Sequence, residues 1–191
     1  MAKYGERQKV LELLIDQGVE RWTIRKLAQA RKINYKSAYT IVHELSRDGV
    51  IALETLGNST LCSFNHRLSP LVFDVECHRR TTLFKDSRIK SIYERLQRLP
   101  TFFIVLVFGS HVKGTATKHS DIDLLIIAED EKPVQQALRL LPLEIHTTGV
   151  TPQEFISMTK SKEFSVVSEV LKKNAILIGI EDYYRLLEHA I

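Results

Sequence analysis

Two apolar segments in the second half of the chain constrain its fold more than any other feature. Thr101–Phe108 is rich in β-branched and aromatic residues, which predicts a buried strand. Asp121–Ile127 begins with Asp-Ile-Asp and continues with aliphatic residues, which predicts a second buried strand. Because alternate residues of a strand point to the same face, Asp121 and Asp123 are expected to converge on one point.

The residues at the ends of these strands favour binding of a cation and of phosphate. Two carboxylates directed together at the entrance of an apolar strand repel each other, and a divalent cation between them stabilises the pair. Gly109-Ser110 directly follows the first strand and can present backbone N–H groups and a hydroxyl to phosphate. The sequence therefore predicts a phosphate-binding turn and a cation-binding pair on consecutive strands.

The spacing of these residues resembles a known signature. A strand ending in Gly-Ser, ten further residues and then Asp-x-Asp is similar to the signature of the DNA polymerase β-like nucleotidyltransferases. The resemblance extends to the minimal nucleotidyltransferase branch, which usually has Arg where Lys113 stands. It implies that Asp121 and Asp123 bind two Mg²⁺ ions and that a nucleoside triphosphate, with ATP as the first candidate, is the substrate. The nucleotide-binding residues that it implies are Gly109, Ser110, Lys113, Gly114 and Ser120.

The same resemblance implies a third carboxylate on a neighbouring strand, which helps to activate the attacking hydroxyl. Pro142–Thr148 predicts a strand with Glu144, His146 and Thr148 on one face. Glu144 is the candidate for this catalytic and metal-binding position, where the family more often has Asp. The alternative is that Glu144 is a surface charge at a strand end. His146 is expected to lie next to the site, because magnesium prefers oxygen ligands.

Residues 1–66 predict a separate module of three helices and a β-hairpin. Its helices are expected from apolar residues at helical spacing, and its hairpin from two strands around a Gly57-Asn58 turn. The first helix is expected over Glu6–Asp16, the second begins at Ile24 after a Thr23 cap, and the third spans Tyr35–Asp48. The two strands of the hairpin are expected over Val50–Thr55 and Thr60–Phe64.

This order of elements resembles a winged helix-turn-helix domain, in which the third helix enters the major groove of DNA. The resemblance implies nucleic-acid binding by the outward residues of that helix, which are Lys36, Ser37, Tyr39, Thr40, His43 and Arg47. Arg and Lys suit phosphates and guanine edges, and Ser, Thr and His can donate to either. The alternative is a protein-docking or dimerisation module, because Glu44 and Asp48 interrupt the basic face.

The remaining segments complete the expected organisation. Residues 67–86 are expected to form a helical connector, with Ser69-Pro70 at the start of a helix. Residues 87–191 are expected to form a small mixed-sheet α/β nucleotidyltransferase domain, whose Leu171–Gly179 pattern resembles the common end of such domains. The whole chain is therefore expected to belong to the α+β class.

Charge and composition separate the two modules and exclude several classes of protein. Residues 1–100 carry 18 Lys and Arg residues and 11 Asp and Glu residues, whereas residues 101–191 carry nine Lys and Arg and 12 Asp and Glu. The first part is therefore basic, and a nucleic acid would bind there. Two cysteines without CxxC spacing argue against a disulfide scaffold or a zinc site. The longest apolar run has seven residues, against about 20 for a membrane-spanning helix. Because the N-terminus also lacks the apolar stretch of a secretory signal, we expect a cytoplasmic protein with no membrane partner.

These features predict a metal-dependent nucleotidyltransferase that moves a nucleoside monophosphate to an acceptor hydroxyl. Two other hypotheses stay open. One is a DNA-binding regulator whose nucleotidyltransferase-like domain senses a nucleotide or mediates homodimerisation. The other is an antitoxin-like protein that modifies a protein partner, for example by adding AMP. Glu144 and Lys113 favour a regulator, whereas the intact Gly-Ser and Asp-x-Asp motifs favour the enzyme.

Overall fold

The computed structural model describes residues 4–18, 20–161 and 165–190. The chain forms two compact units, residues 1–75 and 76–191, and the boundary falls within helix α4 (Pro70–Leu83). The combination of helices with a parallel and several antiparallel strand pairs confirms the α+β class. None of the helices in the described ranges is long and apolar enough to cross a membrane.

Three helices form the core of the first unit: α1 (Glu6–Asp16), α2 (Ile24–Arg31) and α3 (Tyr35–Arg47). Side-chain caps fix the starts of two of them. Thr23 Oγ1 accepts a hydrogen bond from the Lys26 N–H at 3.1 Å, and Asn34 Oδ1 accepts one from the Ser37 N–H at 2.8 Å. The apolar residues at helical spacing, such as Leu27, are buried between the helices. The three predicted helices are thus present.

A three-stranded antiparallel sheet completes the first unit. Its strands are β1 (Trp22–Thr23), β2 (Ile51–Leu56) and β3 (Ser59–Phe64), in the order β1-β3-β2. β2 and β3 form the predicted hairpin, and Gly57 supplies the left-handed φ of 58° at its turn. The sequence does not predict β1, because two residues carry no readable alternation.

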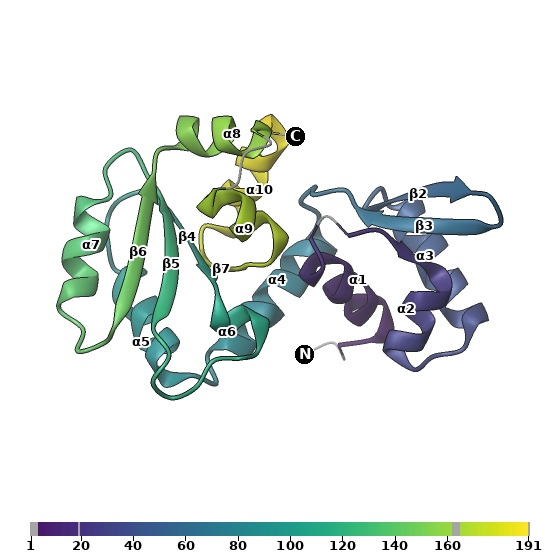
Figure 1. Ribbon diagram of the computed structural model, residues 1–191, viewed down its shortest axis with the longest axis horizontal. Helices are drawn as coiled ribbons and strands as arrows, with labels where there is room; N and C mark the ends of the chain where they lie inside the picture. Colours follow the sequence, from purple (N-terminus) through teal and green to yellow (C-terminus); the bar gives the residue numbers. More distant parts are fainter. Residues whose placement is uncertain (1–3, 19, 162–164, 191) are drawn as a thin grey trace. The chain divides into compact units, whose positions relative to one another are not determined.

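A four-stranded mixed sheet lies at the centre of the second unit (Figure 1). Its strands are β4 (Ile104–Phe108), β5 (Ile122–Ile127), β6 (Ile145–Val150) and β7 (Ala175–Ile178), in the order β6-β5-β4-β7. β5 is parallel to β6, and β4 is antiparallel to both β5 and β7. This topology confirms the predicted mixed sheet.

The first strand of this sheet starts at Ile104, and the prediction of a buried strand from Thr101 is wrong at this end. Ile104 pairs with Ile127, which is the last residue of β5, so the strand pairing stops there. Phe102 lies before the strand and is 97% exposed. Aromatic and β-branched composition indicates a strand but does not show where its partner strand ends.

Helices α5 (Ser87–Leu96) and α7 (Lys132–Arg139) cover one face of the sheet. Their apolar residues form one buried cluster with the even-numbered residues of β5, such as Ile122. Three more helices follow in the chain: α8 (Pro152–Lys160), α9 (Val166–Lys172) and α10 (Ile180–Ala190). α8 packs against α10 through the rings of Phe155 and Tyr183, and α10 contacts β4 and β7. Strand alternation leaves the odd-numbered residues of β5 on the face away from α5 and α7.

Candidate active site

The two predicted metal-binding aspartates lie at the start of β5. Asp121 immediately precedes the strand, and Asp123 is its second residue. Both side chains belong to the sheet face opposite α5 and α7. Asp123 is aligned with Phe108 of β4 and with His146 of β6. The carboxylates of Asp121 and Asp123 are partly open to solvent, with side-chain exposures of 39% and 30%.

Gly109 allows the chain after β4 to pass directly against Asp123. Its φ of 71° and ψ of −142° lie in a backbone region used almost only by glycine. A Cβ on residue 109 would lie 2.1 Å from Oδ2 of Asp123, which is far inside van der Waals contact. Glycine at this position therefore keeps the predicted phosphate-binding turn beside the carboxylate pair.

The turn continues as α6 (Ser110–Lys113), a single turn of helix that ends at Gly114 with a left-handed φ of 75°. Ser110 is half-buried and Lys113 is exposed. The Lys113 Nζ lies 2.8 Å from Oε1 of Glu169, so the ammonium is paired with a carboxylate from α9. Four of the five predicted nucleotide-binding residues thus share one continuous turn that begins beside Asp123.

Ser120, the fifth predicted nucleotide-binding residue, closes the loop that leads into Asp121. Its Oγ accepts a hydrogen bond from the Thr117 N–H at 2.8 Å, and its own N–H donates to the Thr117 carbonyl at 3.2 Å. The Arg88 guanidinium donates to the Ser120 carbonyl at 3.0 Å. The sequence gives no signal for this contact, because Arg88 lies 32 residues before Ser120 in an ordinary amphipathic helix.

β6 places His146 beside the aspartate pair. The imidazole Nδ1 lies 3.7 Å from Oδ1 of Asp123, and Nε2 lies 3.7 Å from Oδ2 of Asp121. His146 is therefore next to the site, as predicted. Glu144 lies just before β6, where its carbonyl accepts a hydrogen bond from the Ile122 N–H at 3.1 Å and its side chain is exposed. The catalytic and metal-binding role of Glu144 stays a prediction.

The aspartate pair is suited to magnesium. This ion prefers oxygen ligands, keeps several waters, and usually binds through one or two carboxylates together with substrate phosphates. The two carboxylates are partly exposed and lie against a turn that has no room for a Cβ. They can therefore bind such an ion and leave space for waters and phosphate oxygens. Within the described ranges, no group of three or more His, Cys, Asp and Glu side chains is arranged to hold a metal. The two aspartates therefore fit such an ion, with further oxygen ligands from outside the pair.

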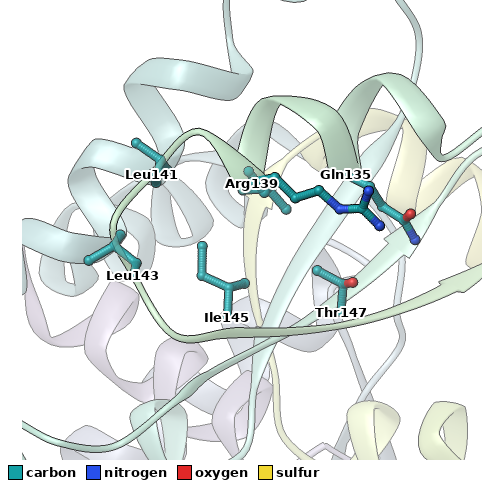
Figure 2. A pocket seen from close by; sticks show the side chains of 7 residues that line it. Gln135, Arg139, Leu141, Leu143, Ile145 and Thr147 are labelled. Atoms are coloured by element: carbon teal, nitrogen blue, oxygen red, sulfur yellow. The ribbon is translucent and has the colours of Figure 1, made fainter.

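A separate cavity of about 270 Å³ lies between α7 and β6 (Figure 2). Its lining residues are Gln135, Leu138, Arg139, Leu141, Leu143, Ile145 and Thr147. Ile145 and Thr147 alternate with His146 along β6, so this cavity lies on the sheet face opposite the carboxylates. It is not part of the candidate active site.

In the first unit, the predicted nucleic-acid-binding residues lie on the solvent side of α3. Lys36, Ser37, Tyr39, Thr40 and Arg47 are exposed, and His43 is half-buried. The Tyr39 ring lies 4.1 Å from the His43 ring and 6.3 Å from the Tyr35 ring, measured between centroids. Tyr35 is absent from the predicted set, yet it is 54% exposed and extends this row. Its spacing of four residues from Tyr39 is the signal that could have found it.

Most of the second unit matches a known protein family. Residues 90–183 match the family model described as "Polymerase beta, Nucleotidyltransferase". This segment is therefore similar to the polymerase β-type nucleotidyltransferases. The match supports nucleotidyltransferase-type activity and nucleotide binding. The matched segment contains all the positions predicted above to bind nucleotide and metal.

No curated protein sequence matches this chain significantly. Among solved structures, an archaeal chromatin protein, TrmBL2, is similar over 80% of this chain and 67% of its own length. The sequence identity is 14% and the TM-score is 0.28, and the structure of TrmBL2 is described as showing a novel mode of DNA binding. A TM-score this low carries no argument about this chain. The likeness to nucleotidyltransferases therefore rests on the family match.

Proposed function

We propose that the protein is a metal-dependent nucleotidyltransferase that moves a nucleoside monophosphate from a nucleoside triphosphate, ATP being the first candidate, to an acceptor hydroxyl. The acceptor oxygen forms a bond to the α-phosphorus, the bond from that phosphorus to the oxygen bridging the β-phosphate breaks, and pyrophosphate leaves. The observation that carries the proposal is the contact of the Gly109 turn with Asp123 inside the segment that matches the nucleotidyltransferase family.

The carboxylates would have two tasks. Asp121 and Asp123 would hold two magnesium ions, with Glu144 as a third ligand. When bound, the ions stabilise negative charge on the attacking and leaving oxygens. Glu144 is also the candidate to accept the proton that the acceptor hydroxyl loses.

The turn after β4 would bind the triphosphate. Gly109 and Ser110 would donate backbone N–H groups and a hydroxyl to the β- and γ-phosphates. The Lys113 ammonium would offset phosphate charge once it leaves Glu169, with which it is paired at 2.8 Å. Gly114 ends this turn with its left-handed φ, and Ser120 would complete the nucleotide site from the neighbouring loop.

We further propose that the first unit acts as a winged helix that binds nucleic acid through α3. The support is the order of three helices and a hairpin, together with the exposure of Lys36 and Arg47 on the same helix. The residues proposed to contact nucleic acid are Lys36, Ser37, Tyr39, Thr40, His43 and Arg47. Replacing Lys36 by Ala is expected to weaken binding to all DNA sequences alike and to reduce the slope of affinity against salt by about one, which filter binding at several salt concentrations measures.

The test of the enzymatic proposal compares two positions of a radioactive label. The full chain is incubated with magnesium, cell extract and ATP labelled at either the α- or the γ-phosphate. Nucleotidyl transfer predicts that the α-label enters an acceptor and that the γ-label leaves with pyrophosphate. Asp121→Asn and Asp123→Asn should abolish incorporation. Asp182→Asn is the matched control, because Asp182 is an exposed aspartate of the same unit, in α10.

Equal incorporation by the wild type and both site variants would remove the catalytic assignment. Incorporation of the γ-label alone would indicate phosphoryl transfer instead. The fraction that receives the α-label, whether nucleic acid, protein or small molecule, identifies the class of acceptor. Label in protein would favour the antitoxin-like hypothesis of partner modification.

A DNA-binding regulator that senses nucleotide is the second candidate. The strand expected to supply the third carboxylate is β6. The residue of β6 that lies 3.7 Å from both aspartates is His146, whose imidazole favours a regulator. It is also favoured by the pairing of Lys113 with Glu169. Equilibrium dialysis that detects ATP binding, together with no transfer of the α-label, would support the regulator. A change of homodimerisation on addition of ATP, followed by light scattering, would support it further.

A further inference from the structure

Arg88 in α5 holds the loop that precedes the aspartate pair. Its guanidinium donates hydrogen bonds to three backbone carbonyls of this loop: Thr117 at 3.4 Å, Lys118 at 3.1 Å and Ser120 at 3.0 Å. The loop connects α6 to β5, and its next residue is Asp121. The contacts of Arg88 therefore set the position from which Asp121 enters the site.

Asp86 fixes the Arg88 guanidinium. Asp86 is the N-cap of α5, and its carboxylate accepts hydrogen bonds from the Arg88 backbone N–H at 2.9 Å, from Nε at 3.1 Å and from Nη2 at 2.7 Å. Arg88 thereby holds the pKa of Asp86 below its ordinary value, and Asp86 raises the pKa of Arg88. Both groups are charged at neutral pH, and hydrogen bonds between charged groups are stronger than those between neutral ones.

Asp86 also contacts the predicted phosphate-binding turn. Its Oδ2 lies 3.6 Å from Nδ1 of His111, which is the second residue of α6 and has a side-chain exposure of only 4%. The turn that begins at Gly109 and the loop that ends at Asp121 are therefore both tied to the Asp86–Arg88 pair. These two segments carry the predicted phosphate-binding and metal-binding groups.

We propose that Asp86 and Arg88 are positioning residues for the metal–nucleotide site. They hold the Gly109 turn and Asp121 at the separation that simultaneous binding of a divalent cation and a triphosphate requires. Neither residue is one of the proposed ligands, and both act through the loop carbonyls and His111. The inference rests on the proposed function, because that function supplies the cation and the triphosphate.

The chemistry of arginine makes the proposal specific. A guanidinium presents five N–H donors in a rigid planar fork, whereas a lysine ammonium presents three donors on one nitrogen. Arg88→Lys therefore keeps the positive charge but cannot span a carboxylate and three separated carbonyls. Asp86→Asn keeps the shape of the side chain and removes its charge. Arg98→Lys is the matched control, because Arg98 is exposed just beyond the end of α5.

The test measures binding of Mn²⁺, a spectroscopic substitute for Mg²⁺, to the full chain with α,β-methylene-ATP, which cannot transfer its α-phosphoryl group. Electron paramagnetic resonance gives the concentration of free Mn²⁺. Arg88→Lys is expected to weaken Mn²⁺ binding by about 10- to 100-fold, the usual effect of removing a group that orients metal ligands. Asp86→Asn should weaken it in the same direction, and Arg98→Lys should leave it unchanged.

Circular dichroism in the same buffer gives the melting temperature of each variant. Because the affinities are compared well below these temperatures, weaker Mn²⁺ binding reports a misplaced site and not an unfolded protein. A fully folded Arg88→Lys protein that binds Mn²⁺ within about twofold of the wild type overturns the inference and leaves the proposed function intact. Absence of Mn²⁺ binding by the wild type itself overturns the proposed function, and this inference with it. If Arg88→Lys does not fold, the same comparison is decided by Asp86→Asn.

Discussion

Replacing Gly109 by Ala tests the close approach on which the candidate site depends. The added Cβ would lie 2.1 Å from Oδ2 and 3.0 Å from Cγ of Asp123. The φ of 71° and ψ of −142° at residue 109 also become unfavourable once a Cβ is present. The variant must therefore either move the turn away from β5 or rotate the Asp123 side chain.

The magnitude follows from these two penalties. A non-glycine residue in this backbone region costs about 1–3 kcal/mol, and an off-rotamer carboxylate adds about 0.5–1.5 kcal/mol. The free energy of unfolding should therefore fall by about 1.5–4.5 kcal/mol. Gly57→Ala is the matched control: Gly57 also has a left-handed φ, 58°, but a Cβ there would meet no described atom within 4 Å. That variant should lose about 1–2 kcal/mol.

Urea unfolding followed by circular dichroism measures both stability changes, and Mn²⁺ binding measures the effect on the carboxylates. Gly109→Ala should weaken Mn²⁺ binding, because Asp123 is displaced, whereas Gly57→Ala should bind Mn²⁺ as the wild type does. The reasoning is refuted if Gly109→Ala binds Mn²⁺ normally. It is also refuted if the two alanine variants lose the same stability and the same affinity.

Three further predictions concern other residues. Glu169→Gln should tighten binding of a fluorescent ATP analogue by up to about fivefold, because a half-exposed ion pair with Lys113 contributes at most about 1 kcal/mol; unchanged affinity would mean that this pair does not compete with nucleotide. Arg88 holds the pKa of Asp86 below its ordinary 3.8, so the pair stabilises the fold above that pH, and the stabilisation is lost as pH falls through the lower folded-state pKa. Melting temperatures of the wild type and Asp86→Asn should accordingly converge in acid, and a constant difference down to about pH 2 would contradict this account. Burial raises the pKa of the Cys62 thiol to about 11, so mass spectrometry should find it alkylated by iodoacetamide only after unfolding, and labelling of the native protein would show that β3 opens.

The sequence predicts those parts of the fold that depend on local chemistry. Thr23 marks the start of α2, because its hydroxyl caps a neighbouring N–H. The Gly57 turn marks the hairpin, because it needs a left-handed residue. The Asp-x-Asp spacing of Asp121 and Asp123 determines a shared face, since the strand repeat is two residues. Each of these signals lies within a few neighbouring residues of one segment.

The parts that the sequence does not predict depend on contacts between distant segments. The strand pairing that ends at Ile104 depends on where β5 stops, so composition alone assigns Phe102 to the interior. The bonds from Arg88 to the loop before Asp121 join residues about 30 positions apart, and no periodicity records them. The alignment of His146 with Asp123 likewise depends on how two parallel strands are paired.

That parallel pairing has a chemical consequence for the site. Side chains return to the same face of a strand every two residues, so a shift of β6 by two positions against β5 would leave every buried residue on its own face. The shift would nevertheless exchange the imidazole of His146 for the carboxylate of Glu144 beside Asp123. The register of β6 therefore determines whether Asp123 faces an imidazole or a carboxylate on the neighbouring strand. An insertion of two residues before β6 that advanced the strand in this way would change the charge beside Asp123 without any substitution in the site.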